Sequence, residues 1–503
     1  MSRRPNILFI TADQWRGDCL SSAGHPQVRT PNTDALARSG SRFARHHAAT
    51  APCSPARASL YTGLYQMNHR VLWNGSPLDD RFDNIGRAAR RAGYLPTLFG
   101  YTDTSPDPRC HHPADPVLTT YEGILPGFVA GQLLLEDDKT WLSWLRKRGF
   151  RSEQLARIHH VAPEEGERIS RNPTVYGADE TPTAFLTDAF LSWLGEQETG
   201  TPWFAHVSFL RPHPPICVPE PYNRMYDAEE GPAFAGPPTP DQEALAHPLQ
   251  AALLSTMGLK SHIPGAEGLV RDLDRRDIAR LRALYYGMIS EVDDQIGRLM
   301  AGLDASGMAG DTLVILTSDH AEMMGDHFML GKGGYLEQSY HVPLIIRGPG
   351  MAEGQVIDRF TSAVDLFPTL VDLLDVSPLH QPDGRSLRPF LNGDTPSDWR
   401  DYALWEFSFR HMEVASEVPA GEEPARGKSL ISLRTDDWQY VHSPGTPDLF
   451  LTPGASGRPS VTPLEDVPLH VRLEALERLL ALRMCHQDET LCHSMVWAYH
   501  ADR

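Results

Sequence analysis

The stretch NILFITADQ, residues 6–14, decides the fold class. Its apolar run, rich in Ile, Leu and Phe, ends at Asp13, and such a run is typical of a parallel strand buried on both faces. The segment DTLVILTSDH, residues 311–320, repeats the pattern and ends in Asp319 and His320. In open parallel sheets, ligands bind beyond the carboxyl ends of the strands. The sequence therefore predicts that these three polar side chains meet at one site.

A strongly periodic helix is predicted directly before the second strand. Its apolar residues recur at spacings of three and four, and the glycine-containing segment AGLDASG follows them. This order of helix and strand favours an α/β fold with a doubly wound, mostly parallel central sheet flanked by helices. The periodic residues are Ile278, Leu281, Leu284, Tyr285, Met288, Ile289, Val292, Ile296 and Leu299.

The composition of the chain changes after VDLFPTLVDLLDV, residues 364–376, which is predicted to be an amphipathic helix. Proline and glycine then become frequent, and we place a domain boundary near Gly393. The segment SLISLRTDDWQYVHS, residues 429–443, reads as a hairpin, because TDD separates two β-prone runs. We therefore expect a large domain over residues 1–393. A smaller C-terminal domain over residues 394–503 would hold an antiparallel sheet and a helical tail.

The charge balance and the apolar stretches exclude several kinds of partner. Lys plus Arg number 46 and Asp plus Glu number 65, so the formal net charge is 46 − 65 = −19. This charge argues against nucleic acid or an anionic membrane surface as a partner. No apolar stretch approaches a membrane span, and the first residues lack the pattern of a signal peptide. We expect a cytoplasmic enzyme. The cysteines are scattered without CxxC pairs, so neither a zinc knuckle nor a disulfide framework is indicated.

One cysteine lies where a helix is predicted to begin. The stretch TAPCSPARASLYTGLY, residues 50–65, contains Cys53, Pro55 and Arg57. Proline favours the first turn of a helix, and a helix N-terminus attracts anions. Cysteine-dependent phosphatases need the longer spacing Cys-x5-Arg, whereas the spacing here is Cys-x-Pro-x-Arg. That pattern resembles the sulfatase signature, in which a formylglycine-generating maturation enzyme oxidises the cysteine. On this pattern alone, a structural cysteine remains the alternative.

Further motifs extend the resemblance to the sulfatase family over nearly the whole chain. TADQW (residues 11–15), RPHPP (211–215) and TSDHAEMMGDHFMLGKGGY (317–335) occur in the family's order. The runs CSPARASLYTGLYQMNHR (53–70) and GYTDTSPDPR (100–109) are most similar to phosphonate monoester hydrolases and related dimeric arylsulfatases. The resemblance implies an alkaline-phosphatase-like fold with a smaller C-terminal subdomain.

The resemblance also implies a metal centre. Asp13, Asp319, His320 and the modified Cys53 would hold one divalent cation. Many sulfatases carry a second acid and an Asn where this chain has Gln14 and His320, and that change from oxygen to nitrogen favours Mn²⁺. Ca²⁺ and Mg²⁺ remain alternatives. Gln14 would either supply a carbonyl oxygen to the metal ion or lie next to the metal ligands without contacting the ion.

By the same resemblance, the nucleophile would be the gem-diol of formylglycine at position 53. One hydroxyl would attack the ester to give a covalent intermediate, and the other would expel it. Arg57 would orient the diol and the anion, and His213 and Lys332 would contact the nonbridging oxygens and the leaving group. Asn74 matches a substrate-binding asparagine of the subgroup, although Asn-Gly is also a strong turn signal.

The stretch GYLPTLFGYTD, residues 93–103, departs from the pattern of ordinary sulfatases. Those proteins have a Lys and a His where this chain has Tyr101 and Asp103. The tyrosine is shared with phosphonate monoester hydrolases, where a Thr is expected in place of the aspartate. Loss of a cation and gain of a carboxylate disfavour phosphate monoester dianions more than monoanions.

We therefore predict a metal-dependent hydrolase of monoanionic esters, namely phosphonate monoesters, phosphodiesters and aryl sulfates. The alternatives are a dedicated arylsulfatase or, if Cys53 is not oxidised, a catalytically silent anion-binding homologue. The histidine pairs at residues 46–47 and 111–112 are predicted to lie in loops or at the surface.

The subgroup that this sequence resembles forms dimers or dimers of dimers, with C-terminal segments that reach toward a neighbouring subunit. The resemblance therefore implies a homo-oligomer, either a dimer or a tetramer, held partly by the segment LALRMCHQDETLCHSMVW, residues 480–497. Its leucines Leu480, Leu482 and Leu491 would be buried against a neighbouring subunit, so truncation after Leu476 should shift the protein toward monomer. The alternative is a helix docked on its own subunit.

Overall fold

The computed structural model describes residues 4–410, 429–453 and 459–487. Its main sheet has eight strands in the order β5-β4-β6-β1-β7-β8-β2-β9. These strands are β1 (Asn6–Ala12), β2 (Ser41–His47), β4 (Thr97–Gly100), β5 (Val129–Leu133), β6 (Phe204–Phe209), β7 (Thr312–Thr317), β8 (Leu344–Arg347) and β9 (Gln355–Ser362). Only β8 runs antiparallel to its neighbours. The predicted mostly parallel α/β sheet is confirmed.

Strand β1 lies at the centre of this sheet, between β6 and β7. Thr11 is in register with Thr317, so Asp13 and Asp319 leave the sheet at the same edge. All residues of β1 are buried, which explains why its sequence is continuously apolar rather than alternating. The two strands that the sequence singled out are therefore direct neighbours.

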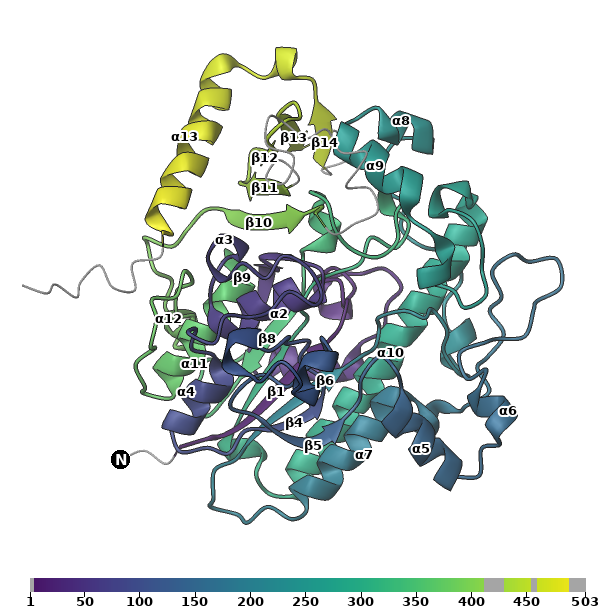
Figure 1. Ribbon diagram of the computed structural model, residues 1–503, viewed down its shortest axis with the longest axis vertical. Helices are drawn as coiled ribbons and strands as arrows, with labels where there is room; N and C mark the ends of the chain where they lie inside the picture. The colour runs from purple at the N-terminus through teal and green to yellow at the C-terminus, as the bar shows by residue number, and fades with distance from the viewer. Residues whose placement is uncertain (1–3, 411–428, 454–458, 488–503) are drawn as a thin grey trace, which may run out of the picture.

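Two hydrophobic cores lie on the two faces of the sheet. Figure 1 shows the helices that flank the sheet. Leu8 and Ile10 of β1 belong to one core, whereas Ile7 and Phe9 belong to the other, as expected when side chains alternate along a strand. The first core contains residues of α1 (Pro31–Arg38), α5 (Lys139–Lys147), α7 (Pro182–Leu194) and α10 (Arg275–Ala305). The second contains residues of α2 (Cys53–Thr62), α4 (Ile85–Arg91), α11 (Leu366–Leu373) and α12 (Arg388–Leu391). This arrangement is the predicted doubly wound architecture.

The periodic helix is longer than the apolar pattern that predicted it, and the helices not yet described are shorter or lie at the periphery. The segment predicted from Ile278 to Leu299 forms α10, which extends from Arg275 to Ala305, and Asp274 caps its first turn by accepting from the Asp277 amide. The other helices are α3 (Gln66–His69), α6 (Ser152–Leu155), α8 (Pro240–Ala244), α9 (Pro248–Thr256) and α13 (Leu469–Cys485). No helix in the described ranges is long and apolar enough to cross a membrane.

A second sheet has the strand order β14-β13-β12-β11-β10-β3. Its strands are β3 (Thr50–Ala51), β10 (Ala403–Ser408), β11 (Ser429–Arg434), β12 (Gln439–His442), β13 (Leu449–Pro453) and β14 (Pro459–Thr462). The predicted hairpin is the antiparallel pair of β11 and β12. Strand β3 pairs in parallel with β10, so this sheet also takes a strand from just before Cys53. The boundary near Gly393 stays a prediction.

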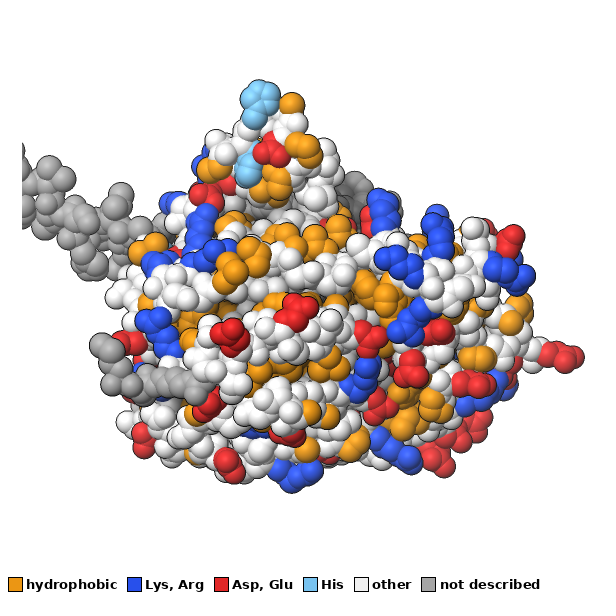
Figure 2. Space-filling view, turned by 90° about the horizontal axis from the view of Figure 1, so that it is seen from below, with side chains coloured by type: hydrophobic (Ala, Val, Ile, Leu, Met, Phe, Trp, Pro, Cys, Tyr) orange, Lys and Arg blue, Asp and Glu red, His pale blue; other side chains and the backbone are white. Residues whose placement is uncertain are grey.

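One prediction about histidines is wrong. His46 and His47 are buried in β2, where His46 contacts the Thr361 hydroxyl and His47 contacts Glu337. The pair at residues 111–112 lies in a partly exposed loop, as expected. The face shown in Figure 2 carries Lys and Arg interspersed with Asp and Glu.

Candidate active site

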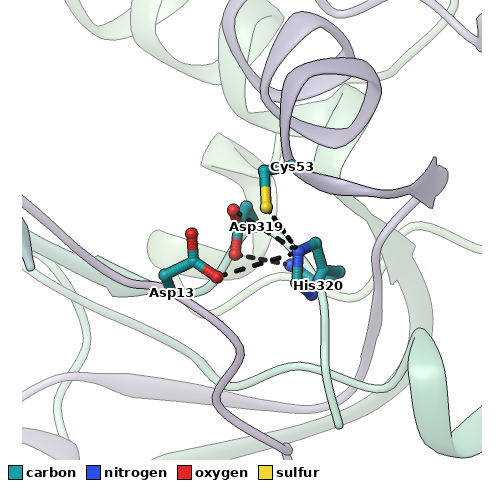
Figure 3. A group of neighbouring side chains, drawn as sticks. All are labelled: Asp13, Cys53, Asp319 and His320. Atoms are coloured by element: carbon teal, nitrogen blue, oxygen red, sulfur yellow. Dashed lines mark hydrogen bonds and ion pairs between the residues drawn. The ribbon is translucent and has the colours of Figure 1, made fainter. Parts of the chain in front are cut away.

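The predicted ligands Asp13, Cys53, Asp319 and His320 come together in one buried group (Figure 3). One potential ligand atom from each residue lies within 4.8 Å of the others. The Asp13 and Asp319 side chains follow β1 and β7, and Cys53 begins α2. His320 Nε2 lies 3.7 Å from Asp13 Oδ1 and 3.8 Å from Asp319 Oδ2. The adjacent strand ends thus bring together residues about 300 positions apart in the chain.

The two carboxylates of this group have opposite pKa shifts. Burial raises the pKa of Asp319 to about 6, and the nearby Asp13 carboxylate adds to the rise. Burial acts in the same direction on Asp13, but His213, His320, Arg57 and Lys332 together hold the pKa of Asp13 well below its usual range. Burial also lowers the pKa of His320 to about 3, so its imidazole is neutral.

The group fits a divalent cation. Asp13 Oδ1 is a buried carboxylate oxygen without a hydrogen-bond partner among the described residues. The neutral imidazole of His320 and the carboxylates of Asp13 and Asp319 are the forms that ligate metals. Two oxygen donors and one nitrogen donor suit Mn²⁺ and related ions, and they do not exclude Ca²⁺ or Mg²⁺.

Cys53 is buried at the first residue of α2. Its Sγ lies 3.2 Å from His320 Nε2. Burial, with Asp13 next, raises the pKa of the Cys53 thiol well above its usual value. The unmodified side chain is therefore a protonated thiol and a poor nucleophile. The following backbone amide, that of Ser54, donates to Asn74 Oδ1 at 3.0 Å, which ties the Asn74 loop to the start of the helix.

Arg57 lies one helical turn beyond Cys53 and is completely buried. Its Nε donates to Asp319 Oδ2 at 3.0 Å and its Nη2 donates to Asp13 Oδ2 at 3.1 Å. Its Nη1 donates to Ser208 Oγ at 2.9 Å, a contact that the sequence did not predict. The guanidinium thus holds both carboxylates in place. Its expected contact with the diol and the anion stays a prediction.

Tyr101 and Asp103 differ sharply in their contacts. The Tyr101 hydroxyl donates to Asp13 Oδ2, and the Arg57 guanidinium lies 4.2 Å from the centre of its ring. Asp103 is 1 % exposed and has a left-handed φ of 49°, and neither carboxyl oxygen has a hydrogen-bond partner among the described residues. Burial raises the pKa of Asp103 well above its usual range, with Arg57 opposing the shift. The substrate-binding roles of both residues stay predictions.

Gln14 links Lys332 to a glutamate that the sequence analysis did not identify as a site residue. Lys332 Nζ donates to Gln14 Oε1 at 2.7 Å, and Gln14 Nε2 donates to Glu322. Glu322 also accepts from the amides of Met324 and Gly331, and burial raises its pKa to about 7. Gln14 therefore positions the lysine, and its backbone amide donates to Asp319 Oδ1 at 3.3 Å. The signal in the sequence that could have identified Glu322 as a site residue is its position, two residues after His320.

A cavity of about 560 Å³ opens beside this group. Gln14, Asn74, His213 and Lys332 all line it. Burial, with Lys332 next, lowers the pKa of His213 to about 3, and His213 Nδ1 lies 2.8 Å from the Pro214 carbonyl oxygen. Three of the predicted catalytic and binding residues, Asn74, His213 and Lys332, thus line one cavity together with Gln14. The sequence analysis did not identify the other lining side chains, which include Trp73, Tyr121, Glu136 and His262.

Comparison with known proteins supports the same chemistry. A family model described as Sulfatase matches residues 5–376. The chain is 37% identical to the "Multifunctional alkaline phosphatase superfamily protein PehA" of Trinickia caryophylli, over 97% of each chain. It is 29% identical to an arylsulfatase of Clostridium perfringens, over 81% of this chain and 82% of that one.

Among solved structures, the chain is similar to the phosphonate monoester hydrolase of Agrobacterium radiobacter, with a TM-score of 0.93, 52% identity and 98% of each chain covered. This similarity identifies the fold as alkaline-phosphatase-like. The family match spans most of the chain and includes the strand ends that carry Asp13, Asp319 and His320 and the helix start that carries Cys53. The protein therefore belongs to the sulfatase family and is a hydrolase.

Proposed function

We propose that this hydrolase cleaves monoanionic esters, namely phosphonate monoesters, phosphodiesters and aryl sulfates, with formylglycine made from Cys53 as its nucleophile. The observation that carries the proposal is the buried group of Asp13, Cys53, Asp319 and His320 beside the cavity that contains His213 and Lys332. The test compares kcat/KM for an aryl phosphonate, an aryl sulfate and an aryl phosphate on one preparation. Hydrolysis of the two monoanions ahead of the phosphate dianion is expected. Activity restricted to the sulfate would instead identify a dedicated arylsulfatase.

One divalent cation would be held by Asp13, Asp319, His320 and the modified residue 53. It would supply Lewis-acid stabilisation of the ester oxygens and lower the pKa of the nucleophilic hydroxyl. Mn²⁺ is our preferred ion, because His320 supplies a nitrogen donor. A formylglycine-generating maturation enzyme is the partner that this chemistry requires. Without that oxidation, residue 53 stays a buried, protonated thiol. The protein would then be a catalytically silent anion-binding homologue.

Some side chains around the cavity would stabilise charge, and others would position the substrate. Burial opposes the Lys332 charge, but Cys53, Asp13, Asp319 and Glu322 raise the pKa of Lys332, so its ammonium stays protonated beside the reacting group. An ammonium there stabilises negative charge that develops on the ester oxygens. His213 lines the same cavity and would contact the leaving group or a nonbridging oxygen. Asn74, whose Oδ1 accepts from Ser54, would offer its amide group to the substrate.

Asp103 supports the preference for monoanions. It is buried near Arg57, Asp13 and Asp319 and has no hydrogen-bond partner among the described residues. Burial raises the pKa of this carboxyl group, so it offsets part of the positive charge at the site only when the pH is high enough to ionise it. A dianion gains more from positive charge than a monoanion does, so it also loses more when that charge is offset. Asp103 would therefore set selectivity by charge rather than by shape.

Replacing Asp103 tests this role. Asp103→Thr should raise kcat/KM for an aryl phosphate relative to an aryl phosphonate by about 10-fold, because a buried acidic group is removed. Asp103→Asn, which keeps the shape, should shift the ratio in the same direction. The measurement is the ratio of the two kcat/KM values on each preparation. An unchanged ratio in both variants would remove Asp103 from the account of selectivity.

Helix α13 supports a homo-oligomer, either a dimer or a tetramer. Ala475 and Leu479 pack onto the second sheet of the same subunit. On another face of the helix, large apolar side chains are exposed at spacings of three and four: Leu469, Leu473, Leu476, Leu480 and Met484. Such a stripe on a docked helix favours an interface with a second copy. Leu482 is partly buried in its own subunit, and Leu491 lies outside the described residues.

Truncation after Leu476 would remove residues from both the docked face and the exposed face of this helix. A point substitution on the exposed face alone is therefore the sharper test. Leu480→Glu should shift the sedimentation profile toward monomer, because it places a charge on the exposed stripe and leaves Leu479 in place. Ala481→Glu, which adds the same charge at the neighbouring exposed position, is the matched control. Unchanged assembly in the Leu480 variant would contradict an interface on this face.

A further inference from the structure

We propose that the mouth of the catalytic cavity binds a cationic nitrogen carried by the ester, so that the preferred substrates are zwitterions: monoanionic esters with a quaternary or protonated amine. Two chemically different sets of side chains line the cavity, and Trp73, Tyr121 and Glu136 are the set that would bind the cation. The inference rests on the proposed hydrolysis of monoanionic esters and names the substrate class within it.

The first wall of the mouth is the turn that carries Trp73. The Trp73 ring packs edge-on against Phe407 of β10, with 6.3 Å between the ring centres. Its backbone amide donates to Ser76 Oγ at 3.1 Å. The next residue is Asn74, which is tied to the start of the catalytic helix. The indole is thus held beside the group that performs the chemistry.

The second wall is the segment around Tyr121. Gly75 has a φ of 90°, and a Cβ added there would lie 3.8 Å from Tyr121 Cβ, so the Trp73 turn and Tyr121 are neighbours. The Tyr121 carbonyl accepts from Ser105 Oγ, and the Gly123 carbonyl accepts from Thr102 Oγ1. These contacts also connect the wall to the loop that contains Asp103.

Glu136 gives this aromatic mouth a negative charge. Its Oε2 accepts from the Tyr121 hydroxyl at 2.8 Å, and its backbone amide donates to Glu122 Oε1 at 2.6 Å. In the part of the chain that the structure describes, no Lys or Arg forms an ion pair with Glu136. Its neighbours Asp137 and Asp138 are paired with Lys139 and His159. Glu136 is therefore a carboxylate without a cationic partner among the described residues, and a cationic ligand can neutralise it.

A cation is the ligand that such a mouth favours. Aromatic faces attract ammonium groups through the ring quadrupole, and a carboxylate next to the rings adds direct charge attraction. Lys332 lines the same cavity, and with the metal-binding group beside the cavity it attracts an anion. A zwitterionic ester satisfies both sets of groups at once, whereas a neutral substituent leaves Glu136 without a cationic partner.

The experiment compares two phosphodiesters with the same leaving group and the same single negative charge. The first is p-nitrophenyl phosphorylcholine. The second is its neutral isostere, in which a tert-butyl carbon replaces the quaternary nitrogen. The unmodified enzyme should prefer the cationic ester by about 10-fold in kcat/KM, as expected for a cation–π contact supported by a carboxylate. Because both esters are measured on one preparation, the ratio does not depend on the fraction of active protein.

Glu136→Gln should reduce this preference to about 2-fold or less, and Trp73→Leu should reduce it as well. Asp137→Asn removes the neighbouring carboxylate, which pairs with Lys139, and should keep the full preference. Equal kcat/KM for the two esters in the unmodified enzyme would overturn the inference and leave the proposed function intact. A preference that survives Glu136→Gln would overturn it too. If neither phosphodiester nor any aryl phosphonate or sulfate is hydrolysed, the proposed function fails and the inference falls with it.

Discussion

Cys53→Ser is expected to lose multiple turnover by about 10³-fold or more relative to the matured enzyme. Serine has one hydroxyl, whereas the hydrate of formylglycine has two. After the first attack, a serine variant therefore retains no hydroxyl that could expel the covalent adduct. Cys53→Ala lacks the first hydroxyl as well and should not react at all. The measurement is the time course of aryl phosphonate hydrolysis, with product counted against enzyme.

Cys110→Ser is the matched control for this substitution, because Cys110 is exposed and lies outside the buried group. It should keep full activity. Rapid multiple turnover by the Cys53→Ser protein would contradict the two-hydroxyl mechanism. A single stoichiometric release of product followed by arrest would support it, since the first attack is the step that serine can still perform.

Asp319→Ala should abolish both metal binding and activity, with kcat/KM lower by about 10³-fold or more. Asp319 is one of two carboxylates in the group, so its loss removes a charged oxygen donor from the proposed metal centre. The variant also leaves the Arg57 Nε without its carboxylate partner, and some loss of thermal stability is expected from that unpaired buried charge. Asp13→Ala and His320→Ala should give the same loss of metal.

The measurement for these variants is metal content per chain together with kcat/KM and the far-ultraviolet circular dichroism spectrum. Asp304→Asn on α10 is the control, because it removes an exposed carboxylate that does not belong to the buried group. Full activity with Asp319→Ala would end the metal assignment. Loss of the circular dichroism signal would show that Asp319 is needed for folding, and the conservative Asp319→Asn would then replace it in the test.

The strand ends were predictable from sequence because local patterns encode them. The apolar runs before Asp13 and Asp319 form β1 and β7, which are in register as neighbours. Pro55 likewise implied a helix start, and α2 begins two residues before it, at Cys53. In each case, a few consecutive residues determine the local structure, and the parallel sheet then brings the ends of its strands together at one edge.

The surroundings of the catalytic group were less predictable because they depend on contacts between distant loops. Glu322 is linked to Lys332 by hydrogen bonds through Gln14, which comes from the other end of the chain. Trp73 and Tyr121 meet because a glycine turn lies against a separate loop. His46 is buried because β2 is paired on both sides within the sheet. None of these arrangements has a periodic or local signal in the sequence.

Mass spectrometry of the peptide that contains residue 53 tests the central claim most directly. The protein is purified from its native host or coexpressed with a formylglycine-generating enzyme, and the peptide is analysed with and without an aldehyde-specific probe. The account predicts an aldehyde at residue 53, with hydrolytic activity in proportion to the fraction converted. An unmodified Cys53 thiol in a preparation that hydrolyses aryl phosphonates at full rate would contradict it.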